Sequence, residues 1–263
     1  MEDSSVVIDP FVGDAEDSWG FFAVYDGHGG RQAVDFCEQK LHTTLQDQTA
    51  GPPCGGDELG KLSEMSDEAV SDAFVRCFRR VDDQLKMLGT WRCGCTATVV
   101  LAHRNSSKGT LRLHSANVGD SRAIVIDKND GEHRLSRDHR PTDPAEIQRV
   151  EHEGGFVVRG RVVGQLGVSR ALGDHSLKSV GVTWCPFVSA RDVSLDSVLV
   201  IGSDGLWDVL SDGDVRAVVD RSTAEQIPEK APELLIKAAL RQGSTDNTTT
   251  LVAYFGKQWT QWT

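Results

Sequence analysis

The sequence lacks long apolar runs and any excess of positive charge, and both absences exclude classes of protein. Its apolar stretches are short, as at residues 198–201, whereas a membrane-spanning helix needs about 20 apolar residues. Lys and Arg number 28 against 39 Asp and Glu, so the formal net charge is −11 and a nucleic-acid partner is not expected. The N-terminal Met1-Glu2-Asp3 is acidic and has no apolar signal segment, which favours a cytoplasmic or nuclear location.

The sequence also lacks the cysteine pattern of a small secreted protein. It has six cysteines, but its 263 residues carry no secretory signal, so we expect reduced thiols rather than a disulfide framework. Cys93 and Cys95 form one C-x-C pair, without the second pair that zinc sites usually need. With 39% hydrophobic and 25% charged residues, the composition is that of an ordinary globular chain with a sizeable core. We expect one domain over residues 1–263 and a monomer.

Several segments are rich in β-branched and aromatic residues, which indicates strands. These predicted strands are residues 21–25, 96–102, 110–118, 122–126, 198–201 and 248–255. Residues 105–109 and 128–131 contain Asn and Gly and predict hairpin turns between neighbouring strands.

Other segments predict helices. Apolar side chains recur every three or four residues over 67–88, which is typical of a helix with one face on a core. Asp143-Pro144 supplies a cap and a first-turn proline for a second helix, which Gly154-Gly155 should end. Further helices are predicted from 211 to about 221 and over 231–242. Hairpin-linked strands and paired helices favour an α+β fold, with mostly antiparallel sheets and the helices packed outside.

Aspartates beside glycine or asparagine stand at the ends of predicted strands, at Asp26, Asp120, Asp204 and Asp246. A rigid strand holds a carboxylate at a fixed point, and a neighbouring glycine lets another ligand come close. Without a matching cysteine or histidine cluster, such a set favours Mg²⁺ or Mn²⁺. Two such ions about 3.5–4 Å apart can share a water, lower its pKa and so promote attack on phosphorus. Any single Asp-Gly is more often a turn, so the spacing by itself leaves both interpretations open.

The segment Phe22-Ala23-Val24-Tyr25-Asp26-Gly27-His28-Gly29-Gly30 resembles the signature of the metal-dependent serine/threonine protein phosphatases of type 2C. Further matches follow in order along the chain: Gly94-Cys95-Thr96-Ala97-Thr98, Val118-Gly119-Asp120-Ser121-Arg122-Ala123, Asp138-His139-Arg140-Pro141, Glu153-Gly154-Gly155, Val168-Ser169-Arg170-Ala171-Leu172-Gly173-Asp174, Ser203-Asp204-Gly205-Leu206-Trp207-Asp208 and Ser244-Thr245-Asp246-Asn247. The resemblance implies a four-layer α-β-β-α sandwich of two mostly antiparallel sheets flanked by helix pairs. It also implies hydrolysis of phosphoserine and phosphothreonine in phosphoprotein substrates, by a water that bridges two divalent ions.

The resemblance assigns the central metal ligands residue by residue. Asp26, Asp204 and Asp246 would ligate two Mn²⁺ or Mg²⁺ ions, together with the backbone carbonyl of Gly27. Asp26 and Asp204 therefore count among the catalytic residues. His28 would be the general acid that protonates the departing seryl or threonyl oxygen, because an alkoxide is a poor leaving group. A histidine in a glycine-rich turn can also simply cap a backbone group.

Four more acidic residues are implied to lie around this centre. Glu2 would reach the metals largely through water, and Asp3 would lie beside it. Asp120 would bind a third, weaker ion that Asp204 shares, and Asp208 would hold water around that ion. His139 also lies in a family motif, and we interpret it as structural.

The sequence departs from the family pattern at its start. The family has a phosphate-binding arginine three residues before the position of Met1, and a first strand before it, and both are absent here. Arginine suits this role because its planar fork holds two phosphate oxygens, so its loss should weaken substrate binding and leave a sheet edge uncovered. We interpret the sequence as N-terminally truncated relative to the family, with a genuinely short protein as the alternative. Neither Arg31 nor Arg161 matches the missing arginine.

The chain has no G-x-S-x-G or C-x₅-R motif, so a serine or cysteine nucleophile is not predicted. The alternative hypothesis is a pseudophosphatase, a metal-binding regulatory module with little turnover because the phosphate-binding arginine is missing. Residues 176–192 are expected to form a variable loop that influences substrate choice.

Overall fold

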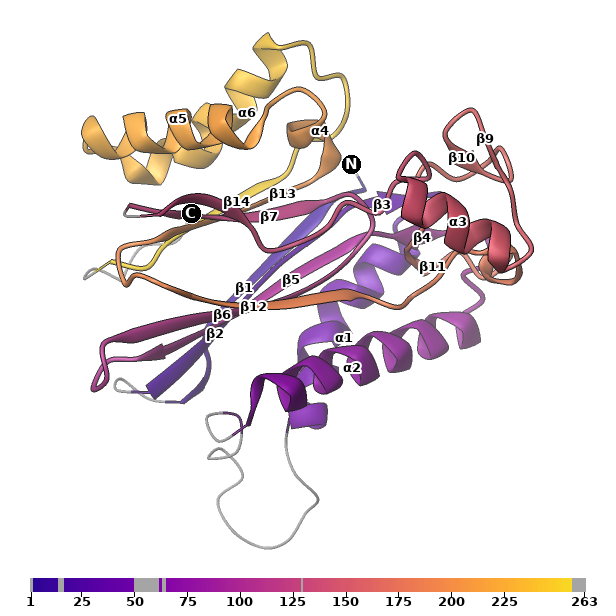
Figure 1. The fold of residues 1–263 in the computed structure, drawn as a ribbon, viewed down its shortest axis with the longest axis horizontal. Coiled ribbons are helices and arrows are strands. Elements are labelled where there is room, and N and C mark those ends of the chain that lie inside the picture. Colours follow the sequence, from indigo (N-terminus) through magenta and orange to yellow (C-terminus); the bar gives the residue numbers. More distant parts are fainter. Residues whose placement is uncertain (1, 14–16, 50–61, 63–64, 129, 257–263) are drawn as a thin grey trace, which may run out of the picture.

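Two antiparallel sheets, stacked face to face, form the centre of the structure (Figure 1). The structure is a computed structural model that describes residues 2–13, 17–49, 62, 65–128 and 130–256. The larger sheet has the order β1-β2-β5-β6-β12, formed by Ser4–Gly13, Asp17–Tyr25, Ala97–Asn105, Thr110–Val118 and Phe187–Val193. The smaller sheet has the order β14-β13-β7-β8, formed by Thr250–Tyr254, Val198–Gly202, Arg122–Asp127 and Gly131–Arg134.

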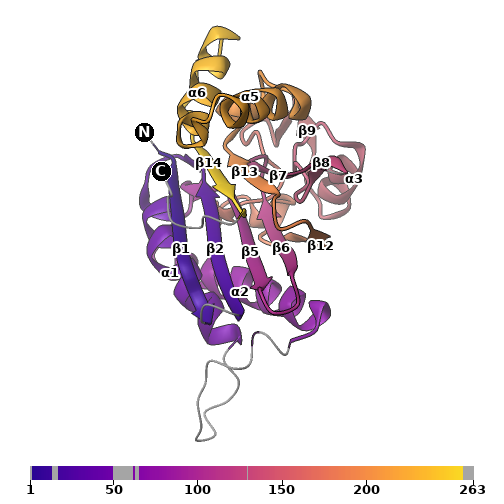
Figure 2. The same cartoon turned by 90° about the vertical axis from the view of Figure 1, so that its left-hand side faces the viewer.

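A pair of helices covers the outer face of each sheet. Helices α1 (Gln32–Thr49) and α2 (Asp67–Met87) pack on the larger sheet, and α5 (Asp212–Ala224) and α6 (Ala231–Arg241) pack on the smaller one. Figure 2 shows β1, β2, β5 and β6 side by side, with α1 and α2 behind them. Helices α5 and α6 lie at the top of this view, above the smaller sheet. The predicted four-layer α-β-β-α sandwich is therefore confirmed.

Alternating side chains along the central strands explain the layers. In β2, Phe21 packs in the core beneath α1 and α2, whereas the next residue, Phe22, packs between the two sheets. In β13, Leu199 packs between the sheets and Val200 packs beneath α5 and α6. Successive side chains of a strand point to opposite faces of the sheet. A strand that is apolar at every position therefore needs another layer of the protein on each face of its sheet.

Short elements complete the fold and lie mainly at one end of the sandwich. Strands β3 (Gly27–His28), β4 (Gly94–Cys95) and β11 (Leu172–Gly173) form a three-stranded sheet, and α4 (Asp204–Trp207) directly follows β13. Helix α3 (Pro144–His152) and the hairpin β9 (Val157–Val158) and β10 (Arg161–Val162) form a projection. In the part of the chain that the structure describes, 3₁₀ helices include Lys178–Val180 and Pro228–Lys230.

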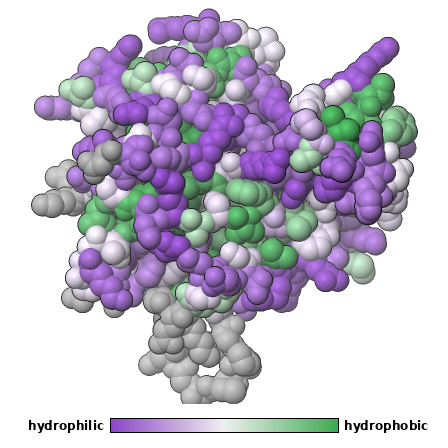
Figure 3. Space-filling view, in the orientation of Figure 1, coloured by the Kyte–Doolittle hydropathy of each residue, from purple (hydrophilic) through white to green (hydrophobic). Residues whose placement is uncertain are grey.

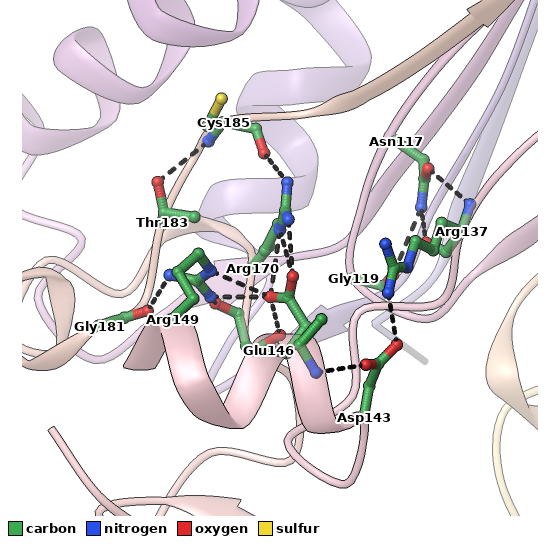
Figure 4. A network of polar contacts seen from close by, with 12 residues as sticks. Asn117, Gly119, Arg137, Asp143, Glu146, Arg149, Arg170, Gly181, Thr183 and Cys185 are labelled. Carbon is green, nitrogen blue, oxygen red and sulfur yellow. Dashed lines mark hydrogen bonds and ion pairs between the residues drawn. The ribbon is translucent and has the colours of Figure 1, made fainter. Parts of the chain in front are cut away.

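The projection has its own small core and a buried ionic network. Val150, Val162 and Val168 pack together in it. The Glu146 side chain, 2% exposed, accepts hydrogen bonds from Arg149, Arg170 and Ser169 (Figure 4). Figure 3 shows hydrophobic residues gathered on this projection, and Phe156, directly before β9, is 55% exposed.

The predicted strands and helices are found with small differences in their bounds. The predicted strand 21–25 begins earlier, at Asp17, and the helix predicted from 211 to about 221 continues to Ala224. Ser66 caps α2 by accepting a hydrogen bond from the Ala69 amide, and Asp143 caps α3 through the Ala145 amide. The 105–109 turn joins β5 to β6 as predicted. Strands β7 and β8 pair on either side of 128–131, although residue 129 lies outside the described residues.

The sequence analysis missed three long elements. Strand β1 was not predicted, because it lies at a sheet edge where its side chains are partly exposed and its apolar pattern is weak. Helix α1 was also missed, although its buried residues Ala33, Val34, Cys37, Leu41 and Leu45 have helical spacing. The loop predicted at 176–192 is wrong from residue 187 onward, because Phe187–Val193 forms edge strand β12 against β6.

None of the helices in the described ranges is long and apolar enough to cross a lipid bilayer.

Candidate metal centre and active site

Four aspartates from distant parts of the chain come together at one end of the sandwich. Asp26 directly follows β2, Asp204 begins α4 after β13, and Asp120 lies in the turn between β6 and β7. Asp3 precedes β1 and is 4% exposed. The charges of Asp3, Asp204 and Asp120 all act on Asp26, and a hydrogen bond joins the Asp26 and Asp204 side chains.

The clustering strongly perturbs the acidity of these groups. Burial, together with the neighbouring carboxylates, raises the pKa of Asp26 to about 9. Burial also raises the pKa of Asp120 to about 7, although the Arg140 guanidinium opposes this shift. The pKa of Asp204 is raised by burial and by the charges of Asp208 and Asp246. Negative charge is therefore costly here unless a cation compensates it.

The residues present fit a hard divalent cation. The Oδ2 atom of Asp3 is buried and has no hydrogen-bond partner in the described part of the chain, which is unusual for a carboxylate. The surrounding donors are carboxylate oxygens, which Mg²⁺ and Mn²⁺ prefer. Within the described ranges, no three Asp, Glu, His or Cys side chains already form a metal cage. Instead, Asp26 and Asp204 contact each other through their hydrogen bond.

The backbone around Asp26 is fixed by the predicted motif that contains Thr96. The Thr96 amide donates to the Asp26 carbonyl at 2.8 Å, and the Asp26 amide donates to Thr96 Oγ1 at 3.1 Å. Thr96 Oγ1 also contacts Ser121 Oγ at 2.7 Å, which links the motif to the loop of Asp120. This motif therefore couples two of the acidic loops.

The N-terminal segment and the last acidic loop meet beside the cluster. The Glu2 amide donates to the side chain of Asn247 at 3.1 Å, next to the exposed Asp246. A Cβ atom on Gly27 would lie 2.7 Å from the Glu2 carbonyl oxygen, so glycine permits this close approach. Arg31, which matched no family arginine, donates to the carbonyl of Asp3 at 3.3 Å.

Arg140 is a residue of this site that the sequence analysis did not select. Its Nη2 atom lies 3.2 Å from Asp120 Oδ2 and also donates to the carboxylate of Asp208. The guanidinium thus bridges the two carboxylates that the resemblance assigns to the third ion. The signal was present in the motif Asp138-His139-Arg140-Pro141.

His139, from the same motif, is fully buried and has no hydrogen-bond partner for either ring nitrogen among the described residues. Burial lowers its pKa to about 3, so the ring is neutral. Its backbone accepts from Ser169 and donates to Gly119, both at 2.9 Å. These contacts agree with a structural role.

His28 lies two residues after Asp26, in β3, with its side chain 30% exposed. Its Nε2 atom is 2.5 Å from Oδ2 of Asp174, a buried residue that the sequence analysis placed in a motif but gave no role. The ring is therefore held by the carboxylate of Asp174, which directly follows β11.

The layered fold and its acidic centre define a class of protein, and comparison with known proteins agrees. The family model described as "Protein phosphatase 2C" matches residues 1–248, and the chain belongs to this family. "Protein phosphatase 2C homolog 1" of Saccharomyces cerevisiae is 33% identical over 97% of this chain and 88% of the relative. The Schizosaccharomyces pombe protein of the same name is 36% identical over 96% of this chain and 68% of the relative.

Solved structures show the same fold. A phosphatase from Toxoplasma gondii superimposes with a TM-score of 0.75 at 22% identity, covering 98% of this chain and 94% of the other. A sex determining protein of C. elegans superimposes with a TM-score of 0.72 at 22% identity, covering 96% of this chain and 64% of the other. The resemblance deduced from the sequence motifs is thus confirmed, and the family supports a protein phosphatase activity that depends on metal ions.

Proposed function

We propose that this chain hydrolyses phosphoserine and phosphothreonine in proteins, with two Mn²⁺ or Mg²⁺ ions held at the acidic cluster. The observation that carries the proposal is the convergence of buried Asp3 and Asp120 with half-buried Asp26 and Asp204, together with an unpartnered Asp3 oxygen. A buried group of carboxylates without a resident cation is unstable, whereas divalent ions make it favourable.

The proposed ligands divide into a central and a peripheral set. Asp26, Asp204 and Asp246, with the carbonyl of Gly27, would hold the two principal ions. Glu2 and Asp3 would contact the same centre from the N-terminal side, Glu2 through water. Asp120, Asp204 and Asp208 would hold a third ion in the place where Arg140 now bridges two carboxylates.

When bound, the ions would neutralise charge and supply an acidic water near neutral pH. Asp26 and Asp204 would hold the ions and so help to orient that water toward the phosphorus atom. His28 delivers a proton to the seryl or threonyl oxygen as its bond to phosphorus breaks. No side chain of the protein becomes phosphorylated.

The alternative of a pseudophosphatase is not favoured, because every aspartate proposed as a ligand is present and the family relatives are named phosphatases. The single domain over 1–263, the monomeric state, phosphoprotein substrates and the cytoplasmic or nuclear location remain predictions.

The test is phosphate release from a phosphothreonine peptide by the purified chain, first stripped with a chelator and then titrated with Mn²⁺. We expect turnover only with metal, and in Asp204→Asn a loss exceeding the roughly 10- to 100-fold typical of outer-shell residues. Circular dichroism should show an unchanged fold in this variant. Mn²⁺ binding without turnover in the wild type would favour the pseudophosphatase, and wild-type rates in Asp204→Asn would contradict the assigned role.

A further inference from the structure

The small sheet of β3, β4 and β11 brings two side chains together across a glycine. In this sheet β4 is central, and Gly94 pairs with His28 on one side and with Gly173 on the other. Asp174 directly follows Gly173. Its carboxylate reaches across Gly94 to the imidazole of His28, although the two residues are 146 positions apart in the sequence.

The backbone is adapted to this contact at two positions. A Cβ atom on Gly94 would lie 2.0 Å from Asp174 Oδ2 and 2.8 Å from His28 Nε2, so any side chain there would displace the pair. Asp174 itself has a φ of 50°, in the left-handed region that non-glycine residues seldom adopt. Backbone strain of this kind persists where the surrounding structure fixes it, and it gathers at functional sites.

The surroundings hold Asp174 in place and keep it away from solvent. Its residue exposure is 3%, its amide donates to the Cys93 carbonyl at 3.0 Å, and its carbonyl accepts from Leu177 at 2.9 Å. The preceding Gly173 amide donates to Asp82 of α2 at 2.8 Å. Asp82 also pairs with Lys178 at 3.1 Å, which anchors β11 to the helix layer. Asp174 is thus buried and held by backbone hydrogen bonds, whereas the side chain of its partner His28 is partly exposed.

We propose that Asp174 is a positioning residue that acts through His28, an inference that rests on the proposed phosphatase function. The Asp174 carboxylate accepts the Nε2–H of His28 and fixes both the rotamer and the tautomer of the ring. The Nδ1 atom is then the one that faces the leaving group. Carboxylates that orient a histidine in this way are common in catalytic and metal sites.

The proton movement in the reaction is then defined atom by atom. The attacking water gives one proton to solvent, and its oxygen forms the new bond to phosphorus as the bond from phosphorus to the seryl or threonyl oxygen breaks. The electron pair of that bond stays on the departing oxygen, which takes the proton on Nδ1 and gives the free alcohol. The ring keeps its Nε2–H, which Asp174 holds throughout, and Nδ1 regains a proton from solvent before the next turnover.

The test compares two substrates that differ in their need for a proton. A phosphothreonine peptide releases an alkoxide and needs the acid, whereas p-nitrophenyl phosphate releases a stable phenolate. With Mn²⁺ present, Asp174→Asn should lower kcat on the peptide about 100-fold with KM unchanged, but alter p-nitrophenyl phosphate turnover less than about threefold. Asp82→Asn, which loosens the same strand without touching His28, is the matched control and should change both rates equally.

A second variant and a double mutant distinguish a specific effect on His28 from a general loss of folding. Gly94→Ala, whose methyl group takes the place of the Asp174 oxygen, should give the same selective loss on the peptide. In a His28→Ala background, Asp174→Asn should cause no further loss, because Asp174 acts only through the ring. Equal losses on both substrates, or additive losses in the double mutant, would overturn the proposal.

A spectroscopic readout separates this inference from the proposed function. Nitrogen NMR of the histidine rings in the metal-free protein should show His28 protonated at Nε2, and Asp174→Asn should abolish that signature. If the wild type hydrolyses neither substrate, the proposed function fails, while the NMR result still decides whether Asp174 fixes the ring. A His28 that is protonated at Nδ1 alone in the wild type would refute the positioning role.

Discussion

Replacing Asp26 by asparagine should stabilise the metal-free protein and remove its response to metal. Burial and the charges of Asp3, Asp204 and Asp120 raise the pKa of Asp26 to about 9, from 3.8. The folded state therefore binds this proton more tightly than the unfolded chain does. The resulting stability is full below about pH 4 and is lost as the pH rises toward 9. At pH 7.5 most of this stability is lost in the wild type. Asparagine cannot ionise, so the Asp26→Asn variant should be more stable than the wild type at this pH.

The magnitude follows from the shift itself. In the unfolded chain Asp26 is ionised above about pH 4, whereas the folded protein keeps it protonated. Each pH unit between 3.8 and 7.5 therefore lowers the free energy of unfolding by about 1.4 kcal/mol, a loss of at most about 5 kcal/mol at pH 7.5. Relaxation and water entry reduce such penalties in real proteins, so we expect Asp26→Asn to gain about 1 to 3 kcal/mol without metal. Wild-type protein should in turn gain about 2.7 kcal/mol from Mn²⁺ at 100 times its dissociation constant.

The assay is chemical unfolding at pH 5 and pH 7.5, with chelator or with Mn²⁺. The wild type without metal should be less stable at pH 7.5 than at pH 5, and Mn²⁺ should reverse the difference. Asp26→Asn should flatten this pH dependence, lose the metal-induced gain and lose phosphatase activity. Metal-free Asp26→Asn that is less stable than the wild type at pH 7.5 would refute the reasoning about the acidic cluster.

Two further predictions concern arginine contacts near the centre and in the projection. Arg140→Met should free the carboxylates of Asp120 and Asp208 and strengthen Mn²⁺ binding at the third-ion position in a calorimetric titration. The control Arg137→Met, whose partner is Asp143, should leave Mn²⁺ binding unchanged. Equal Mn²⁺ affinities of the two variants would contradict competition between the Arg140 guanidinium and the ion. Burial would raise the pKa of Glu146, but hydrogen bonds from Arg170, Arg149 and Ser169 outweigh it and hold that pKa below its usual range. Glu146→Ala should therefore destabilise the projection by about 3 to 5 kcal/mol, because it removes the buried carboxylate that pairs with both Arg170 and Arg149. Hydrogen exchange of α3 measures this, and unchanged protection would contradict it.

Local patterns in the sequence determined the central elements of the fold. The apolar runs of β2 and β13 read as strands because every residue in them is partly or fully buried, and the stripe of α2 read as a helix because one face packs on the core. Aspartates at the ends of these strands were visible for the same reason, since a carboxylate after an apolar run stands out locally. Elements with weak patterns, such as the edge strands β1 and β12, were missed because exposed positions impose little constraint on residue type.

Only the tertiary structure decided which distant groups meet. Strand pairing places Gly94 between His28 and Gly173, and no spacing in the sequence records a contact across 146 residues. The bridge from Arg140 to Asp120 and Asp208 likewise depends on how two loops and a helix end pack together. Local chemistry limits what a residue can do, but the electrostatic field around it is a sum over neighbours that only folding brings close.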